Sequence, residues 1–102
     1  MDSWQAISES ELDALISEQL LACSLEQRQL FDCIKVPLAA VPVAGSDSVD
    51  VFFVVAKKGD TVIYYQDIEE GFNLSTLTPD GQLSSLGYQD WHLTHALRQL
   101  AP

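Results

Sequence analysis

The sequence predicts a single α+β domain over residues 1–102, with an antiparallel sheet of about four strands, two N-terminal helices and one C-terminal helix. Capped amphipathic segments fill the first third of the chain. Apolar β-branched and aromatic runs follow, and a leucine stripe closes the chain. Helices segregated from consecutive strands are typical of the α+β class. A length of 102 residues suits one domain.

The first helix is expected at about residues 9–22. Ser8 and Glu11 form a capping box, in which the side chain of each accepts a hydrogen bond from the backbone N–H of the other. Ile7 and Leu12 stand at the hydrophobic staple positions on either side of this cap. A single stripe that is expected to be buried then follows helical spacing, formed by Leu12, Leu15, Ile16, Gln19, Leu20 and Cys23.

A second helix is expected directly after the first. Ser24 and Gln27 repeat the three-residue spacing of a capping pair, which predicts a short helix to about Cys33. Residues 31–36 also alternate between apolar and polar types in the manner of a strand. The end of this second helix therefore stays open at the level of sequence.

Extended structure follows. Pro37 and Pro42 confine the residues between them to an edge strand or an extended connector, because proline cannot donate a hydrogen bond to a strand ladder. Residues 49–68 then form two apolar runs joined by Lys-Lys-Gly-Asp at 57–60, a pattern that predicts a β-hairpin.

This hairpin is apolar on both faces. Alternation places one set on the first face and the other set on the second face, namely Val51, Phe53 and Val55 against Phe52, Val54 and Ala56. Tyr64 and Tyr65 also point opposite ways. Helices can cover one face. The other face needs either helices on the opposite side or a second copy of the chain, and we expect a homodimer through the second face of the 49–68 hairpin.

The last third of the chain completes the sheet and adds a helix. Residues 72–77 alternate as a half-buried strand, and Thr-Pro-Asp-Gly at 78–81 is a strong turn signal. Residues 82–86 are expected to form a short further strand. Asp90 is then expected to cap a final helix whose apolar stripe is Leu93, Ala96, Leu97 and Leu100.

Charge restricts the class of partner. Fifteen acidic residues against five basic ones give a net charge of −10, and seven acids but one base fall within residues 1–34. Binding to nucleic acid phosphates or to an anionic membrane needs clustered Lys and Arg, so neither is expected. A protein partner, if there is one, is expected to be basic. The alternative is that acidity only keeps the protein in solution.

The sequence predicts a cytoplasmic protein. No apolar run approaches the roughly 20 residues that cross a bilayer, and the N-terminus lacks the pattern of a secretory signal. Cys23 and Cys33 are expected to be reduced thiols, and there is no Cys-x-x-Cys pattern to indicate a metal or redox pair.

No enzyme is predicted and no cofactor is expected. The chain has neither a Gly-x-Ser-x-Gly elbow nor a glycine-rich phosphate loop. The alternative from this class is a small metal-dependent enzyme. It would use His92 and His95, three residues apart on the last helix, with a carboxylate from Asp67, Glu69 or Glu70.

The end of the hairpin is the candidate partner-binding surface. Acidic and aromatic residues gather there in the composition of a protein-recognition surface, and the candidates are Tyr65, Asp67, Glu69, Glu70 and Phe72. The alternative is that both tyrosines of the strand belong to the core, with their hydroxyls at its edge.

Residues 64–73, followed by Asp80-Gly81 and the leucine-rich closing helix, resemble small uncharacterised bacterial α+β proteins. Some of those resemble immunity proteins that neutralise toxins, and the resemblance implies an inhibitor or immunity partner. Small size, the net charge of −10 and the absence of catalytic motifs support the leading hypothesis, a non-enzymatic, acidic protein-binding module. A homodimeric structural subunit is a further alternative.

Overall fold

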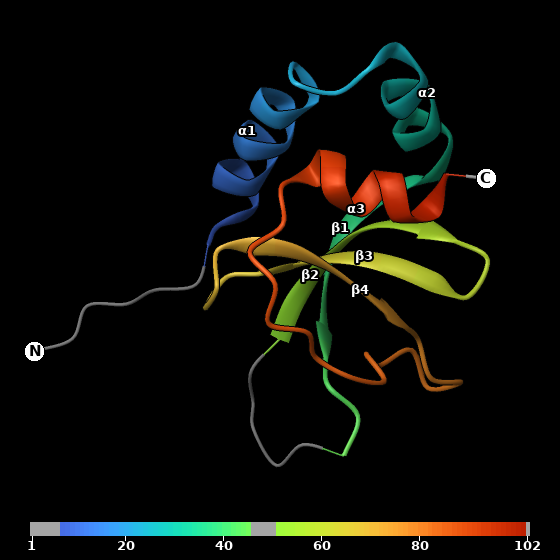
Figure 1. The fold of residues 1–102 in the computed structure, drawn as a ribbon. Helices are drawn as coiled ribbons and strands as arrows, with labels where there is room; N and C mark the ends of the chain where they lie inside the picture. Colours follow the sequence, from blue (N-terminus) through green and yellow to red (C-terminus); the bar gives the residue numbers. More distant parts are fainter. Residues whose placement is uncertain (1–6, 46–50, 102) are drawn as a thin grey trace, which may run out of the picture.

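The fold is a four-stranded antiparallel sheet with three helices, in a computed structural model that describes residues 7–45 and 51–101. The strands are ordered β1-β2-β3-β4. The elements in chain order are α1 (Glu9–Leu20), α2 (Leu25–Ile34), β1 (Lys35–Pro42), β2 (Val51–Lys58), β3 (Thr61–Gln66), β4 (Gly71–Thr76) and α3 (Leu93–Leu100) (Figure 1). The predicted α+β class is confirmed. None of the described helices is both long and apolar enough to cross a membrane.

Local sequence signals account for the ends of most elements. Both predicted capping boxes are formed, at Ser8 with Glu11 and at Ser24 with Gln27. α2 runs to Ile34 and passes directly into β1, which settles the open choice between helix and strand for residues 31–34 in favour of helix. The β2–β3 turn has Gly59 at φ 61°, the positive angle that the first loop residue of a type II′ hairpin requires.

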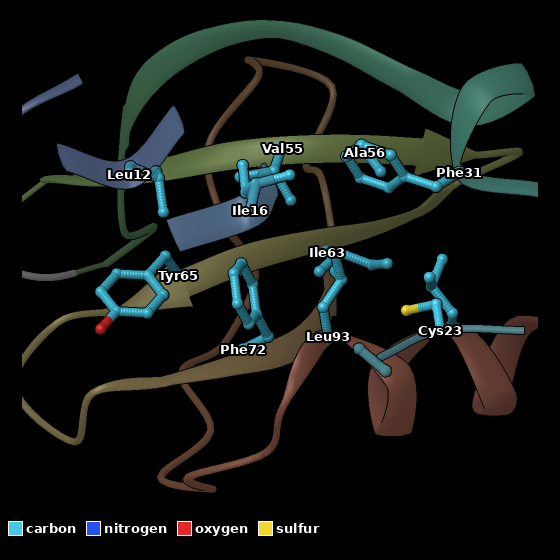
Figure 2. Packing of buried hydrophobic residues seen from close by; sticks show 12 residues of the cluster. Leu12, Ile16, Cys23, Phe31, Val55, Ala56, Ile63, Tyr65, Phe72 and Leu93 are labelled. Atoms are coloured by element: carbon cyan, nitrogen blue, oxygen red, sulfur yellow. The ribbon is translucent and has the colours of Figure 1, made fainter. Parts of the chain in front are cut away.

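All three helices lie on one face of the sheet, with α3 between α1 and α2 (Figure 1). Their apolar side chains and those of the strands form one buried cluster, so the alternative of helices on opposite faces is wrong. Figure 2 shows part of this cluster: Leu12, Ile16, Phe31 and Leu93 from the helices, and Val55, Ala56, Ile63, Tyr65 and Phe72 from the sheet.

One predicted facing is wrong. Ala56 belongs to the cluster under the helices, with Val55, whereas simple alternation placed it with Phe52 and Val54 on the second face. The pairing of β2 with β3 shifts register between Val54 and Ala56. Such a β-bulge inserts an extra residue and reverses the alternation beyond it.

The second face of the sheet is covered by the chain itself. Residues 77–91 are here called the return segment. The segment passes beneath the sheet on the side away from the helices and then rises beside β4 toward α3 (Figure 1). Leu83 of this segment is fully buried against strand residues of that face, forming a second cluster with Phe52, Val54, Val62 and Tyr64. These side chains are therefore not available to form a dimer interface. The homodimer stays a prediction, but an uncovered second face of the hairpin no longer supports it.

Leu83 also ties the first strand to the last. Its N–H donates to the carbonyl of Pro42 at 2.8 Å, and its carbonyl accepts from the N–H of Ala44 at 2.8 Å. On its other side it forms an antiparallel bridge with Leu77, just after β4. Within residues 82–86 only Leu83 forms isolated bridges, so this stretch is not the predicted further strand. β1 is the edge strand that its prolines indicated.

Buried polar side chains hold the return segment on the sheet. We call the set the polar clasp: Tyr64 and Gln66 of β3 with Asn73 and Ser75 of β4. The Tyr64 hydroxyl accepts a hydrogen bond from the N–H of Gly87. The Gln66 amide donates to the carbonyl of Gly87 at 3.2 Å. β3 therefore satisfies both backbone groups of Gly87.

The β4 half of the clasp works in the same way. The Asn73 amide nitrogen donates to the carbonyl of Gln89 at 2.9 Å, and its oxygen accepts from the N–H of Gln89 at 3.0 Å. The Ser75 hydroxyl donates to the carbonyl of Ser85 at 3.0 Å. A segment without regular secondary structure needs such partners for its backbone groups when it covers a core.

The final helix begins in an unexpected way. Its N-cap residue is His92, which makes no side-chain capping bond, so the prediction that Asp90 caps the helix is wrong. Just before the helix, the backbone runs alongside β4, and the N–H of Phe72 donates to the carbonyl of Trp91 at 2.8 Å. The N–H of Leu93 is instead satisfied by the side-chain oxygen of Gln19 on α1.

We expect Gly87→Ala to destabilise the fold by about 1–3 kcal/mol, because a Cβ at this position would lie 2.5 Å from Oδ1 of Asn73 and overpack the clasp. Tyr88→Ala is the matched control in the same segment, since its side chain is 66% exposed and its effect should stay within about 0.5 kcal/mol. Urea unfolding measures both. Equal stability of the two variants would show that the clasp does not hold the segment.

Candidate functional site

The acidic start of α1 lies beside the acidic turn between β3 and β4. The N–H of Ile7 donates to Oδ2 of Asp67 at 3.2 Å, which fixes the start of α1 beside the β3–β4 turn, and Figure 1 shows the two side by side. The first turns of α1 follow Ile7, and the remaining acids of the turn follow Asp67. We call this set the acidic rim: Glu9, Glu11, Asp13, Asp67, Glu69 and Glu70.

The rim carries its negative charge without counter-ions in the described part of the chain. All its members except the half-buried Asp67 are exposed. The one ion pair among the described residues joins Asp32 to Lys35 at 2.9 Å and lies outside the rim. Hydrogen bonds from the backbone and hydroxyl of Ser8 lower the pKa of Glu11, so this carboxylate stays ionised to a lower pH than an unperturbed glutamate.

Tyr65 and Phe72 lie beneath the rim. Phe72 is fully buried and Tyr65 is 6% exposed, and their rings meet edge to face with centroids 5.1 Å apart. Figure 2 shows the Tyr65 hydroxyl pointing away from the other labelled side chains. Burial raises the pKa of Tyr65, and the nearby carboxylates of Glu70 and Asp67 raise it further.

Of the five candidate partner-binding residues, the structure exposes Glu69 and Glu70 and leaves Asp67 half-buried. The two aromatic residues lie in the core. The aromatic pair supports the turn that carries Glu69 and Glu70. Glu70 has a φ of 56°, a left-handed conformation that the turn imposes on a non-glycine residue. The contribution of α1 to the rim is not predictable from the sequence, because nothing local links Ile7 to Asp67.

The candidate metal ligands His92, His95 and Glu70 do not come together as a coordination site among the described residues. His92 and His95 are both exposed, and their ring centroids are 6.3 Å apart. Within residues 7–45 and 51–101, no group of three His, Cys, Asp or Glu side chains is arranged to hold a metal ion, so Glu70 completes no such set with the histidines.

Both cysteines are free thiols, Cys23 buried and Cys33 exposed. Burial raises the pKa of Cys23, which keeps it protonated and poorly nucleophilic at neutral pH. The thiol of Cys23 lies 3.5 Å from the carbonyl oxygen of Gln19, one turn earlier in the chain. Its role is therefore that of a small core residue.

A groove borders the acidic rim along α1. One hollow of about 290 Å³ is lined by Glu9, Asp13, Ile16, Phe31, Lys35, Val36, Pro37, Leu38 and Val55. A second hollow of about 320 Å³ is lined by Leu20, Arg28, Gln29, Phe31, Asp32 and Lys35. The two share Phe31 and Lys35, and we call them together the helix groove. Sequence reasoning did not find it.

Comparison of the chain with family models, curated proteins and solved structures finds no match. Any function must therefore be argued from the surface itself.

The position of Tyr65 beneath the rim can be tested by titration. We expect Glu70→Gln to lower the pKa of the Tyr65 phenol, because one of the charges that oppose phenolate formation is removed. Assigned tyrosine ¹³Cζ shifts followed between pH 8 and 12 report this pKa. Glu18→Gln, an exposed change at the far end of α1, should leave it unchanged. An unchanged Tyr65 titration in Glu70→Gln would place the carboxylate away from the ring.

Proposed function

We propose that the protein is a non-enzymatic, acidic protein-binding module that works in the cytoplasm and binds a basic protein. The observation that carries the proposal is the acidic rim. Two acidic stretches about 60 residues apart in sequence are fixed together by the bond from Ile7 to Asp67, and none of these carboxylates has a counter-ion in the described structure. A partner with clustered Lys and Arg would neutralise this surface and associate quickly with it.

The rest of the helical layer supports the same partner chemistry. Glu18 on α1 and Glu26 on α2 are also exposed, and Arg28 is the single base on these two helices. A polyanion such as nucleic acid, or an anionic lipid surface, would be repelled by this layer. The inhibitor or immunity role, in which the partner is a basic toxin or enzyme, is one form that such binding could take.

Two of the six rim carboxylates, Glu11 and Asp67, are held in place by hydrogen bonds, which favours recognition over a purely solubilising charge. The capping box fixes Glu11 through bonds of 3.0 and 3.1 Å, and the backbone bond from Ile7 fixes Asp67. Charges that are already positioned lose less conformational entropy when a partner binds.

The test is capture of proteins from the source cells on immobilised protein, at about 50 mM and 300 mM salt. A rim variant carries E9Q, D13N, E69Q and E70Q, which leaves the structural carboxylates of Glu11 and Asp67 in place. The control variant carries E18Q, E26Q, D60N and D80N, the same number of neutralised exposed acids elsewhere.

We expect basic proteins to bind the wild type and the control, to bind the rim variant at least about tenfold more weakly, and to be released at higher salt. Mass spectrometry identifies the captured proteins and gives their charge. Equal capture by the rim variant and the control would contradict a role for the rim. Capture of mainly acidic proteins would contradict the proposal as a whole.

A further inference from the structure

The helix groove exists because β1 leaves its neighbour at its first residues. Lys35 pairs with Ala56, and the next pair is Ala39 with Val54. Four residue steps along β1 therefore match two along β2, and the extra backbone bulges outward. Pro37 and Leu38 lie in this bulge and form one wall of the groove. The groove is thus built by the backbone and does not depend on one side chain swinging away.

The floor of the groove is apolar. Ile16, Phe31 and Val55 line it and are nearly fully buried. A hollow of about 290 Å³ lies at the lower end of the size of ligand sites. It suits one or two anchoring apolar side chains of a larger partner better than a whole small molecule.

Around the first hollow, the charged side chains without an ion pair in the described structure are both acidic. Lys35 lies at the junction of the two hollows, but its amine is held by Asp32 at 2.9 Å, which offsets its charge. Glu9 and Asp13 stand one helical turn apart along the α1 wall and form no ion pair in the described structure. An occupant with a cationic side chain next to its apolar anchor therefore complements this wall.

The length of the groove limits the size of the occupant. The α1 wall runs from Glu9 to Leu20, which is about 16 Å at the helical rise of 1.5 Å per residue. An extended peptide covers this distance with about five residues. Arg28 lines the far hollow and lies away from the two carboxylates, so the cationic end of the occupant should lie toward the start of α1.

We propose that the helix groove binds an extended segment of about five residues from a basic partner protein, with an apolar side chain on the floor at Phe31 and a Lys or Arg against Glu9 and Asp13. This inference rests on the proposed function, because it assigns a docking site to the same basic partner. It adds that binding needs an apolar anchor as well as positive charge.

The probe is an acetylated, amidated peptide with two central leucines flanked by lysines. One comparison peptide replaces the lysines by glutamates, and another replaces the leucines by glycines. Fluorescence anisotropy of the labelled peptides gives the affinity, and ¹⁵N-resolved amide shifts of the protein locate the site. The protein variants are E9Q/D13N and, as a charge-matched control, D60N/D80N, whose exposed acids lie in turns outside the groove.

We expect the lysine–leucine peptide to bind and to shift the amides of Ile16, Phe31 and Leu38. E9Q/D13N should weaken it by about threefold to tenfold, and D60N/D80N by less than about twofold. The glycine peptide should bind at least about threefold more weakly, and the glutamate peptide should not bind.

Two results would overturn the inference while leaving the proposed function intact. One is equal binding of the leucine and glycine peptides, and the other is a set of amide shifts confined to the β3–β4 turn. Failure of the lysine–leucine peptide to bind would overturn the inference by itself. If the capture experiment with basic proteins also failed, the proposed function would fall with it.

Discussion

The rest of the structure depends on a central hairpin that is apolar on both faces. Each buried Val, Ile, Phe or Tyr of β2 and β3 contributes about 1.5–3 kcal/mol only if water is excluded from it, so both faces need a cover. Three helices supply one cover and the return segment supplies the other. The second cover has no regular secondary structure, and buried side chains of β3 and β4 take over the bonding of its backbone. The polar clasp therefore stabilises the apolar face indirectly, because it holds the segment that covers it.

Placing all the helices on one face also shapes the surface that carries the proposed function. α3 occupies the space between α1 and α2, and its first N–H is satisfied by Gln19 of α1 (Figure 1). α1 is thereby held across the sheet with its acidic first turns at the edge, where Ile7 reaches Asp67. On its other side, the bulge of β1 opens the helix groove. The acidic rim and the groove thus share α1, with Glu9 and Asp13 belonging to both.

In the proposed binding mode, this sharing brings two kinds of recognition to one helix. Exposed charge governs how fast and how selectively a partner arrives, whereas a desolvated apolar anchor contributes most of the affinity. In this protein the charges of Glu9 and Asp13 border an apolar floor at Ile16 and Phe31. The aromatic residues of the hairpin exit serve a different purpose. Tyr65 and Phe72 pack beneath the rim and hold the turn that presents Glu69 and Glu70.

The sequence by itself determined those features whose physics is local. Capping boxes at Ser8 and Ser24, the turn at Gly59 and the edge position of β1 each depend on residues within a few positions of one another, and all are as predicted. Tertiary structure decided the facing of Ala56, the cover of the second face, the capping of α3 by Gln19, the joining of the two acidic groups and the groove. These depend on a register shift or on contacts across long separations, 60 residues for Ile7 with Asp67 and 74 for Gln19 with Leu93. Alternation and spacing along the chain carry no information about such contacts, because they arise only once the sheet has been closed on both faces.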